Sequence, residues 1–174
     1  MHKLRDALGD SEADLKRRLE KIAGKNKVYV LGLGNTDRAD DGAGVLVAEA
    51  LKKPFPHHSF SEHDGVEGTV LDISEKKEKA TVFFVDAADM RLEPGAIKVI
   101  DRRDIRETEI TTHRVAVALM ASILESHGKA SCVICIQPKD ITFQGAVTKP
   151  VLDTISTLIE VLSRIMNRAE RGSR

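Results

Sequence analysis

The sequence predicts an α/β fold: a three-layer, open, twisted and mostly parallel sheet of about five strands, with one antiparallel edge strand and helices on both faces. Short apolar runs of strand length alternate along the chain with segments of helical periodicity. Most intervening segments are long enough for the crossover helix that parallel strands require. The 174 residues, 41% apolar and 31% charged, have ordinary globular composition. We therefore expect a single α/β domain over residues 1–174.

The N-terminal segment predicts a helix over residues 3–23. A single apolar stripe defines this helix, and it is formed by Leu8, Leu15, Leu19 and Ile22. Gly24 ends the helix. This helix belongs to an N-terminal helical extension, residues 1–27. Its stripe favours a role in covering the core over a role in docking a partner.

The next elements predict a strand–helix–strand unit. A buried strand over 28–31 runs into Gly32 and Gly34, and a helix over 42–53 ends before Pro54. A strand over 59–63 precedes Asp64 and Gly65, which form a turn.

The middle of the chain predicts a central strand and an edge strand. A short helix over 70–77 precedes a β-branched and aromatic strand over 81–85, which stops at Asp86. The loop over 87–95 is too short for a crossover helix, so the strand over 96–100 must run antiparallel to 81–85, at an edge.

The C-terminal part predicts helix, strand and helix. The helix over 112–125 is apolar almost all round and is expected to be buried against the sheet. A strand over 131–136 follows, and Thr148 and Pro150 start the last helix. One face of that helix is apolar, with Val151, Ile155, Leu158, Leu162 and Ile165.

Composition excludes several classes of function. The 27 basic and 27 acidic residues balance, which argues against nucleic acid as a partner. The sequence contains neither an apolar run of the roughly 18 residues needed to span a bilayer nor a secretory leader, so we expect a cytoplasmic protein without membrane contact. Cys132 and Cys135 lie on a strand at an odd spacing, which puts them on opposite faces as buried, structural thiols.

Three residues are expected to meet at the carboxyl edge of the sheet, where ligands of doubly wound folds bind. Asp41 lies in the loop that follows the first strand, Asp86 ends the central strand, and His113 opens a helix that leads into a parallel strand. Two carboxylates and one imidazole suit a divalent transition metal, such as nickel or zinc. The alternatives are a helix cap for Asp40 or Asp41, an Asx turn for Asp86 and a helix start for His113.

The glycines Gly32 and Gly34 also invite a dinucleotide-binding interpretation, and they can let a ligand approach the backbone closely. The third glycine of that motif would fall at Asp37, however, and Asp37, Asp40 and Asp41 place negative charge where a pyrophosphate would bind. The same charges attract a cation, which favours metal contact over nucleotide binding.

The sequence resembles the family of maturation endopeptidases that trim the C-terminus of the large subunit of nickel-iron hydrogenases. GLGNTDRADDGAG is similar to the family's GxGNxLxxDDGxG, FFVDAADMRLEPG to its central strand with D-A and P-G, and TTHRVAVALMASIL to its S/T-x-H helix. The resemblance covers roughly residues 28–165, which would form the peptidase core. The family's D-G-G-T or D-G-G-S segment appears here at Asp64 and Gly65 with two extra residues, and Asp37 replaces an apolar residue.

The resemblance implies that Asp41, Asp86 and His113 are the catalytic, metal-contacting residues. The nickel would be supplied by the precursor substrate and would serve as the recognition signal, with no organic cofactor. A water polarised by that nickel would cleave one peptide bond. Gly32, Gly34 and Gly42 would shape the loop, Asn35 would brace it, and Asp64 and Gly65 would line the substrate groove.

We therefore expect a monomeric endopeptidase whose partner is the hydrogenase large-subunit precursor. One alternative is a nickel-delivery or nickel-sensing protein with the same ligands and no proteolysis. A peptidyl-tRNA hydrolase has a similar GLGN strand, but it would need a basic cleft where this sequence has TDRADDG. A nucleotide-binding module ranks third.

Overall fold

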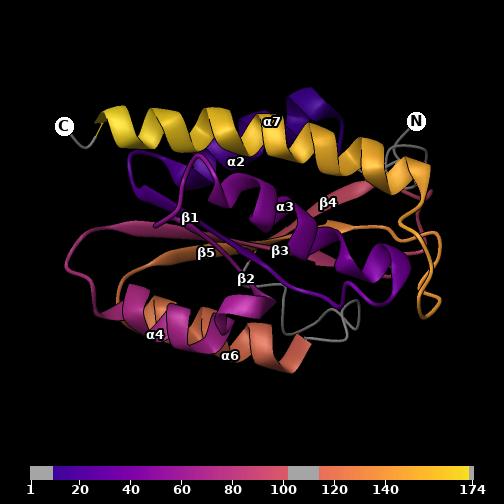
Figure 1. Ribbon diagram of the computed structural model, residues 1–174. Coiled ribbons are helices and arrows are strands. Elements are labelled where there is room, and N and C mark those ends of the chain that lie inside the picture. The colour runs from indigo at the N-terminus through magenta and orange to yellow at the C-terminus, as the bar shows by residue number, and fades with distance from the viewer. Residues whose placement is uncertain (1–9, 102–113, 173–174) are drawn as a thin grey trace.

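The computed structural model describes residues 10–101 and 114–172, which form a five-stranded sheet with helices on both faces (Figure 1). The strands, in the spatial order β2-β1-β3-β5-β4, are β1 (Lys27–Gly32), β2 (Ser59–Ser61), β3 (Ala80–Ala87), β4 (Ile97–Asp101) and β5 (Ala130–Ile136). The α-helices are α2 (Glu12–Ala23), α3 (Ala43–Lys52), α4 (Val66–Glu75), α6 (Arg114–Ser126) and α7 (Lys149–Gly172). Two short 3-10 helices are η1 (Ala39–Gly42) and η2 (Glu62–Asp64).

The side-chain alternation of the strands builds two cores, one on each face of the sheet. On β3, Phe83 and Val85 face the upper core, which α2, α3 and α7 cover. Val82 and Phe84 face the lower core, which α4 and α6 cover. Figure 1 shows the same three layers, with α2, α3 and α7 above the sheet and α4 and α6 below it. The predicted α/β class is confirmed.

The edge strand β4 is antiparallel, as predicted, but its neighbour is β5. Val99 pairs with Ile134 of β5, and β5 in turn pairs in parallel with β3. Residues 96–100 therefore run antiparallel to 81–85 at an edge of the sheet, as predicted, and β5 lies between the two strands. The connecting loop passes the end of β5, where Gly95 N–H donates to Gln137 O at 2.8 Å, and this leaves room for β5 to insert.

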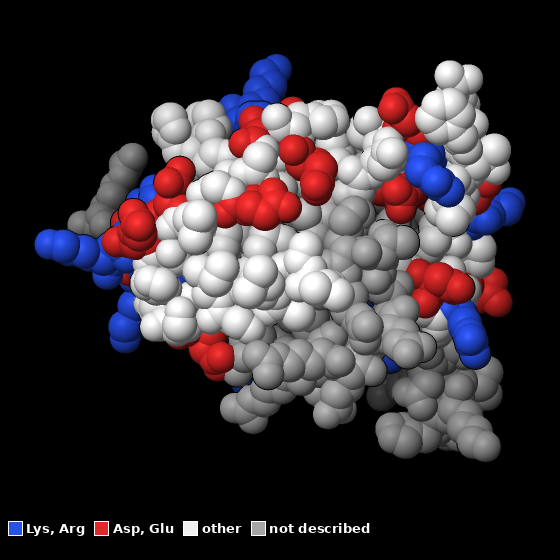
Figure 2. Space-filling model, turned by 90° about the horizontal axis from the view of Figure 1, so that it is seen from below, with Lys and Arg blue, Asp and Glu red and all other residues white. Residues whose placement is uncertain are grey.

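The helix α6 packs against the sheet, as predicted, but only one of its faces is buried. Val117, Met120, Ala121 and Leu124 are buried, but Val115 is 76% exposed and Leu119 is 62% exposed. Only one stripe of an α-helix can face a sheet, so the apolar residues on its far side stay in solvent. Seen from that side in Figure 2, the described residues form a broad uncharged area with Asp and Glu side chains along its border and Lys and Arg side chains toward the outline of the molecule.

Most other element boundaries and burial predictions are close to the structure, but α2 begins at Glu12, with Ser11 as its N-cap, nine residues after the predicted start. The helix α4 begins at Val66, four residues before the predicted start, directly after Gly65 in the left-handed region. Leu15 and Leu19 of α2 are buried in the upper core, which confirms the covering role of that helix. Cys132 and Cys135 are free, buried thiols in opposite cores, as predicted. Within residues 10–101 and 114–172, no helix is long and apolar enough to cross a membrane.

The strand order creates a switch point between β1 and β3. The chain leaves β1 through α3 on one face to reach β2, and it leaves β2 through α4 on the other face to reach β3. Loops at such a point diverge to opposite sides of the sheet and leave a crevice at the carboxyl ends of the strands. The segment after Gly32 and the end of β3 therefore border the expected ligand site.

Candidate functional site

The loop after β1 is packed closely against the start of α3. A Cβ on Gly34, whose φ is 124°, would lie 1.9 Å from Asp41 O, and a Cβ on Gly32 would lie 2.1 Å from Gly44 O. Only glycine fits at such distances. The sequence suggested that a ligand could approach these two glycines, but the space beside them is filled by the backbone of Asp41 and Gly44. This packing holds Asp41 directly beside the end of β1.

Asn35 shapes the turn that carries the loop from Gly34 to η1. Its side-chain Oδ1 accepts the Asp37 N–H at 2.8 Å, and its main-chain oxygen accepts the Arg38 N–H at 3.1 Å. This Asx turn orders an exposed segment of the loop. The bracing predicted for Asn35 corresponds to these two hydrogen bonds.

The neighbouring aspartates Asp40 and Asp41 have different surroundings. Asp40 is fully buried, and its carboxylate accepts the N–H groups of Lys139, Asp140 and Thr148 at 2.7–3.0 Å and the Thr148 hydroxyl at 2.9 Å. Asp41 is half-buried in η1. The N-cap of α3 is Gly42, and among the described residues no side chain caps this helix. The capping alternative for Asp40 and Asp41 is therefore wrong.

Asp86 lies at the end of β3 and is fully buried. It continues the side-chain alternation of Val82 and Phe84 and so belongs to the α6 face of the sheet. Its partner in register is Cys135 on β5. Burial, and then the negative charge of Asp86, raise the pKa of the Cys135 thiol, which stays protonated.

Asp41 and Asp86 come to the same edge of the sheet. The Leu33 N–H donates to Val85 O at 2.8 Å, and η1 packs against β3. The loop that carries Asp41 therefore runs alongside the strand end that carries Asp86. The structure therefore brings together the two segments that carry these predicted carboxylates.

His113 lies outside the described residues, so its predicted contact with a metal stays a prediction. Among residues 10–101 and 114–172, no three His, Cys, Asp or Glu side chains are grouped to hold a metal ion. The following helix α6 begins at Arg114 and leads into β5, which is parallel to β3. Its N-terminal end therefore lies at the carboxyl edge of the sheet.

Asp64 and Gly65 lie one turn beyond β2, in and after η2. The carboxylate of Asp64 accepts the Ser61 N–H at 2.9 Å and lies 2.6 Å from Lys52 Nζ. Burial raises the pKa of Asp64, but the hydrogen bonds from Lys52 and Ser61 outweigh it and lower the pKa overall. Gly65, with a φ of 78°, lets the chain turn into α4. Both residues thus have structural roles at the end of β2.

The loop over residues 137–148 also borders this site, and sequence reasoning gave it no function. In addition to the hydrogen bonds that it donates to the Asp40 carboxylate, this loop accepts the Asp40 N–H at Asp140 O, with a distance of 3.0 Å. The Gln144 N–H of the loop donates to Asp37 O at 2.6 Å. Two of its apolar side chains are exposed, Ile141 and Phe143. No local signal in the sequence joins the two segments, because the burial of Asp40 depends on this distant loop.

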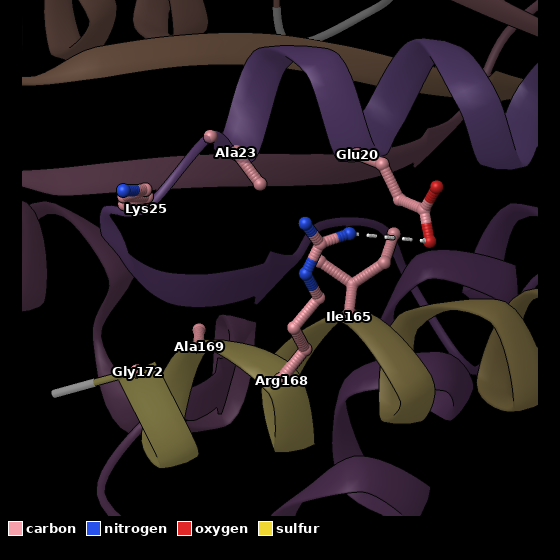
Figure 3. Close-up of a pocket in the computed structure, with 8 residues that line it drawn as sticks. Glu20, Ala23, Lys25, Ile165, Arg168, Ala169 and Gly172 are labelled. Atoms are coloured by element: carbon pink, nitrogen blue, oxygen red, sulfur yellow. Dashed lines mark ion pairs between the residues drawn. The ribbon is translucent and has the colours of Figure 1, made fainter. Parts of the chain in front are cut away.

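A pocket with a volume of about 290 Å³ lies elsewhere, between the ends of α2 and α7 (Figure 3). Arg168 points across it to Glu20, with Nη1 and Oε1 3.9 Å apart. Gly24 and Lys25, which line it, precede β1, so the pocket lies at the amino edge of the sheet. The length of β1 separates it from Asp41 and Asp86, and it is not part of their site.

Comparisons with known proteins agree with this arrangement. A family model described as hydrogenase maturation protease, HycI, matches residues 46–165. The hydrogenase 3 maturation protease of Escherichia coli K12 is 32% identical over 136 residues, which cover 76% of this chain and 86% of that protein.

Solved structures show the same likeness. The [NiFe] hydrogenase maturation protease HycI from Thermococcus kodakarensis KOD1 superposes with a TM-score of 0.72 at 27% identity, over 86% of this chain and 99% of that one. The endopeptidase HycI from Escherichia coli has a TM-score of 0.64 at 27% identity, over 81% and 90% of the two chains. The chain therefore belongs to the hydrogenase maturation protease family and is a peptidase.

Proposed function

We propose that this peptidase removes the C-terminal extension of a nickel-loaded [NiFe]-hydrogenase large-subunit precursor. The nickel belongs to the substrate, and Asp41, Asp86 and His113 contact it as the signal that the precursor is ready for cleavage. Family membership supports the proteolytic reaction, and the similarity to the [NiFe] hydrogenase maturation protease HycI of Thermococcus kodakarensis supports the class of hydrogenase.

One observation carries the assignment of the site. The Leu33 N–H bonds to Val85 O, and this hydrogen bond sets the loop bearing Asp41 beside the strand end bearing Asp86 at the switch point of the sheet. Two carboxylates near one crevice favour a cationic ligand over an anionic one. Asp86 is fully buried, and a carboxylate is stabilised in such a position when a cation approaches it.

The metal would act as a Lewis acid on the scissile carbonyl or on a bound water. The residues of this chain would orient it: Asp41 from the tightly packed glycine loop, Asp86 from the rigid central strand, and His113 from the segment before α6. Asp64 and Gly65 would border the path of the precursor near β2.

The test uses the full chain with nickel-loaded and nickel-free forms of the precursor. The expected result is shortening of the nickel-loaded precursor only, measured by intact-mass spectrometry. Asp41→Asn, Asp86→Asn and His113→Ala are each expected to reduce the cleavage rate by about a hundredfold or more, because each removes a contact to the metal. Asp153→Asn, an exposed acid on α7, is the control and keeps the wild-type rate.

Equal cleavage of both precursor forms would contradict nickel recognition. Transfer of nickel into the precursor without any shortening would instead identify a delivery protein. Wild-type cleavage by the Asp41 and His113 variants would remove these residues from the site.

A further inference from the structure

All six aromatic residues lie in the described part of the chain, and one of them is in solvent. Tyr29, Phe55, Phe83 and Phe84 are buried, and Phe60 packs partly buried against the lower core. Phe143 is 64% exposed, and Ile141, two residues before it, is 48% exposed. Exposed aromatic and aliphatic side chains two residues apart in one loop can contribute to a protein-binding surface when the loop is held next to a functional site.

The loop that carries these two residues is ordered from within. The Asp140 carboxylate accepts the Thr142 N–H at 2.9 Å and the Thr142 hydroxyl, and the Gly145 N–H donates to Thr142 O at 3.1 Å. The hydrogen bonds from the Thr142 hydroxyl and from the Thr142 and Ile141 N–H groups lower the pKa of the Asp140 carboxyl. Phe143 is thus exposed on a defined turn.

The same loop is also fixed from outside, to the segment of the candidate site. The buried Asp40 carboxylate accepts the Lys139, Asp140 and Thr148 N–H groups, and the Gln144 N–H donates to Asp37 O. Asp40 directly precedes Asp41. A buried charge therefore joins the loop of Ile141 and Phe143 to the residue proposed to contact the substrate's metal. In Figure 1 this orange loop lies at the same end of the sheet as the start of α3.

We propose that Ile141 and Phe143 form a docking surface for an apolar segment of the protein substrate, next to the bond that is cut. The occupant is a polypeptide because the chain is a peptidase, and it is apolar because burial of both side chains requires an apolar partner. This inference rests on the proposed function of the Asp41 and Asp86 site. It adds the side chains that select the substrate's sequence.

The first test compares substitutions in the loop with a control substitution at Leu119, whose side chain is about as exposed as that of Phe143. Phe143→Ser and Ile141→Ser are expected to raise KM for the nickel-loaded precursor, about tenfold for Phe143→Ser, with the effect in KM rather than in kcat. Leu119→Ser is the matched control: Leu119 is 62% exposed on α6 and is expected to leave KM unchanged. A KM increase for Leu119→Ser without one for Phe143→Ser would overturn the proposal and place docking on α6.

The second test does not depend on cleavage. A photoreactive benzoylphenylalanine at position 143 is expected to cross-link to the precursor, and the same group at position 119 is not. Cleavage of nickel-loaded precursor by the wild type, together with an unchanged KM for Phe143→Ser and no cross-link at position 143, would refute this inference and leave the proposed function standing. Failure of the wild type to cleave would refute the proposed function instead.

Discussion

At the scale of single residues, two adjacent aspartates have different surroundings, and we propose contact with the substrate's metal for Asp41 alone. Asp40 is buried and accepts four hydrogen bonds from described residues of the loop after β5, whereas Asp41 is half-buried in η1. In Asp40→Asn, an NH₂ group would replace one carboxylate oxygen and would face an N–H or O–H group that now donates to that oxygen. Leaving a buried donor unpaired costs about 1–3 kcal/mol.

Asp40→Asn is therefore expected to lower the free energy of unfolding by about 1–3 kcal/mol and to raise KM, because the loop of Phe143 loses its anchor. Asp37→Asn, an exposed change three residues earlier, should stay within about 0.5 kcal/mol of wild type. Urea titrations of the three proteins measure the difference. Equal midpoints for Asp40→Asn and wild type would contradict the anchoring role.

His58 gives a pH dependence to stability. Burial lowers the pKa of His58, the positive charge of Lys27 lowers it further, and Glu170, with Oε1 3.7 Å from Nδ1, opposes both. The folded state therefore binds this proton less tightly than the unfolded state. The contribution is fully present above the unfolded pKa, about 6.5, and is lost as the pH falls below it.

The expected result is a drop in the free energy of unfolding between pH 7.5 and pH 5.5 that is smaller in His58→Gln than in wild type. Denaturant titrations at the two pH values give both drops. The comparison cancels the contributions of other groups that titrate in this range, because the two proteins share them. Identical drops in the two proteins would show that His58 does not titrate differently in the folded state.

At the scale of elements, two glycines in the first turns of helices make a matched pair. A Cβ on Gly44 of α3 would lie 2.1 Å from Val85 O and 2.4 Å from Leu33 O, whereas a Cβ on Gly68 of α4 meets nothing within 4 Å. Gly44→Ala should destabilise by about 2 kcal/mol or more, since backbone must shift. Gly68→Ala should stabilise by about 0.4–1 kcal/mol, because alanine restricts the unfolded chain and favours the helix.

Thermal unfolding of both variants checks this prediction, and opposite shifts in Tm are expected. A small effect of Gly44→Ala would mean that α3 can move away from the ends of β1 and β3. Since Asp41 lies just before α3, cleavage by the folded Gly44→Ala fraction should also fall.

The elements that sequence predicted well are those with a strong local signal. Continuous apolar runs located β3 and β5, and a single apolar stripe located α7, whose predicted residues Val151, Ile155 and Leu158 are all buried. The start of α4 was missed because Gly68 and its polar neighbours Glu67 and Thr69 give Val66–Thr69 no apolar helical periodicity. The pairing of β4 with β5 could not be predicted, because strand pairing between distant segments is not set by the local pattern.

At the scale of the whole molecule, the candidate site could be predicted as far as topology reaches. Parallel strands bring the loop of Asp41 and the end of β3 with Asp86 to one edge whatever the loop details. The difference between Asp40 and Asp41 could not be predicted, because it depends on a loop about a hundred residues later in the chain. The same loop carries Phe143, so its proximity to the site was equally invisible in the sequence.

The two edges of the sheet have different roles. The amino edge carries contacts that hold the molecule together, such as the Tyr29 hydroxyl bonded to Glu78 at 2.7 Å and the pair of Glu20 and Arg168. The carboxyl edge carries the loops of Asp41 and Phe143. Substitutions far from the carboxyl edge should therefore lower stability without changing KM, whereas substitutions at Asp40 and Gly44 should affect both stability and cleavage.

Leu19 on α2 and Asp41 test this separation. Leu19 is fully buried in the upper core, so Leu19→Ala should lower the free energy of unfolding by about 2–5 kcal/mol. Cleavage measured well below its Tm should keep the wild-type KM, because α2 packs against α7 and the sheet. Asp41→Asn should do the opposite, with unfolding within about 0.5 kcal/mol of wild type and cleavage lost. A raised KM in the folded Leu19→Ala protein would instead make α2 part of the precursor-binding surface.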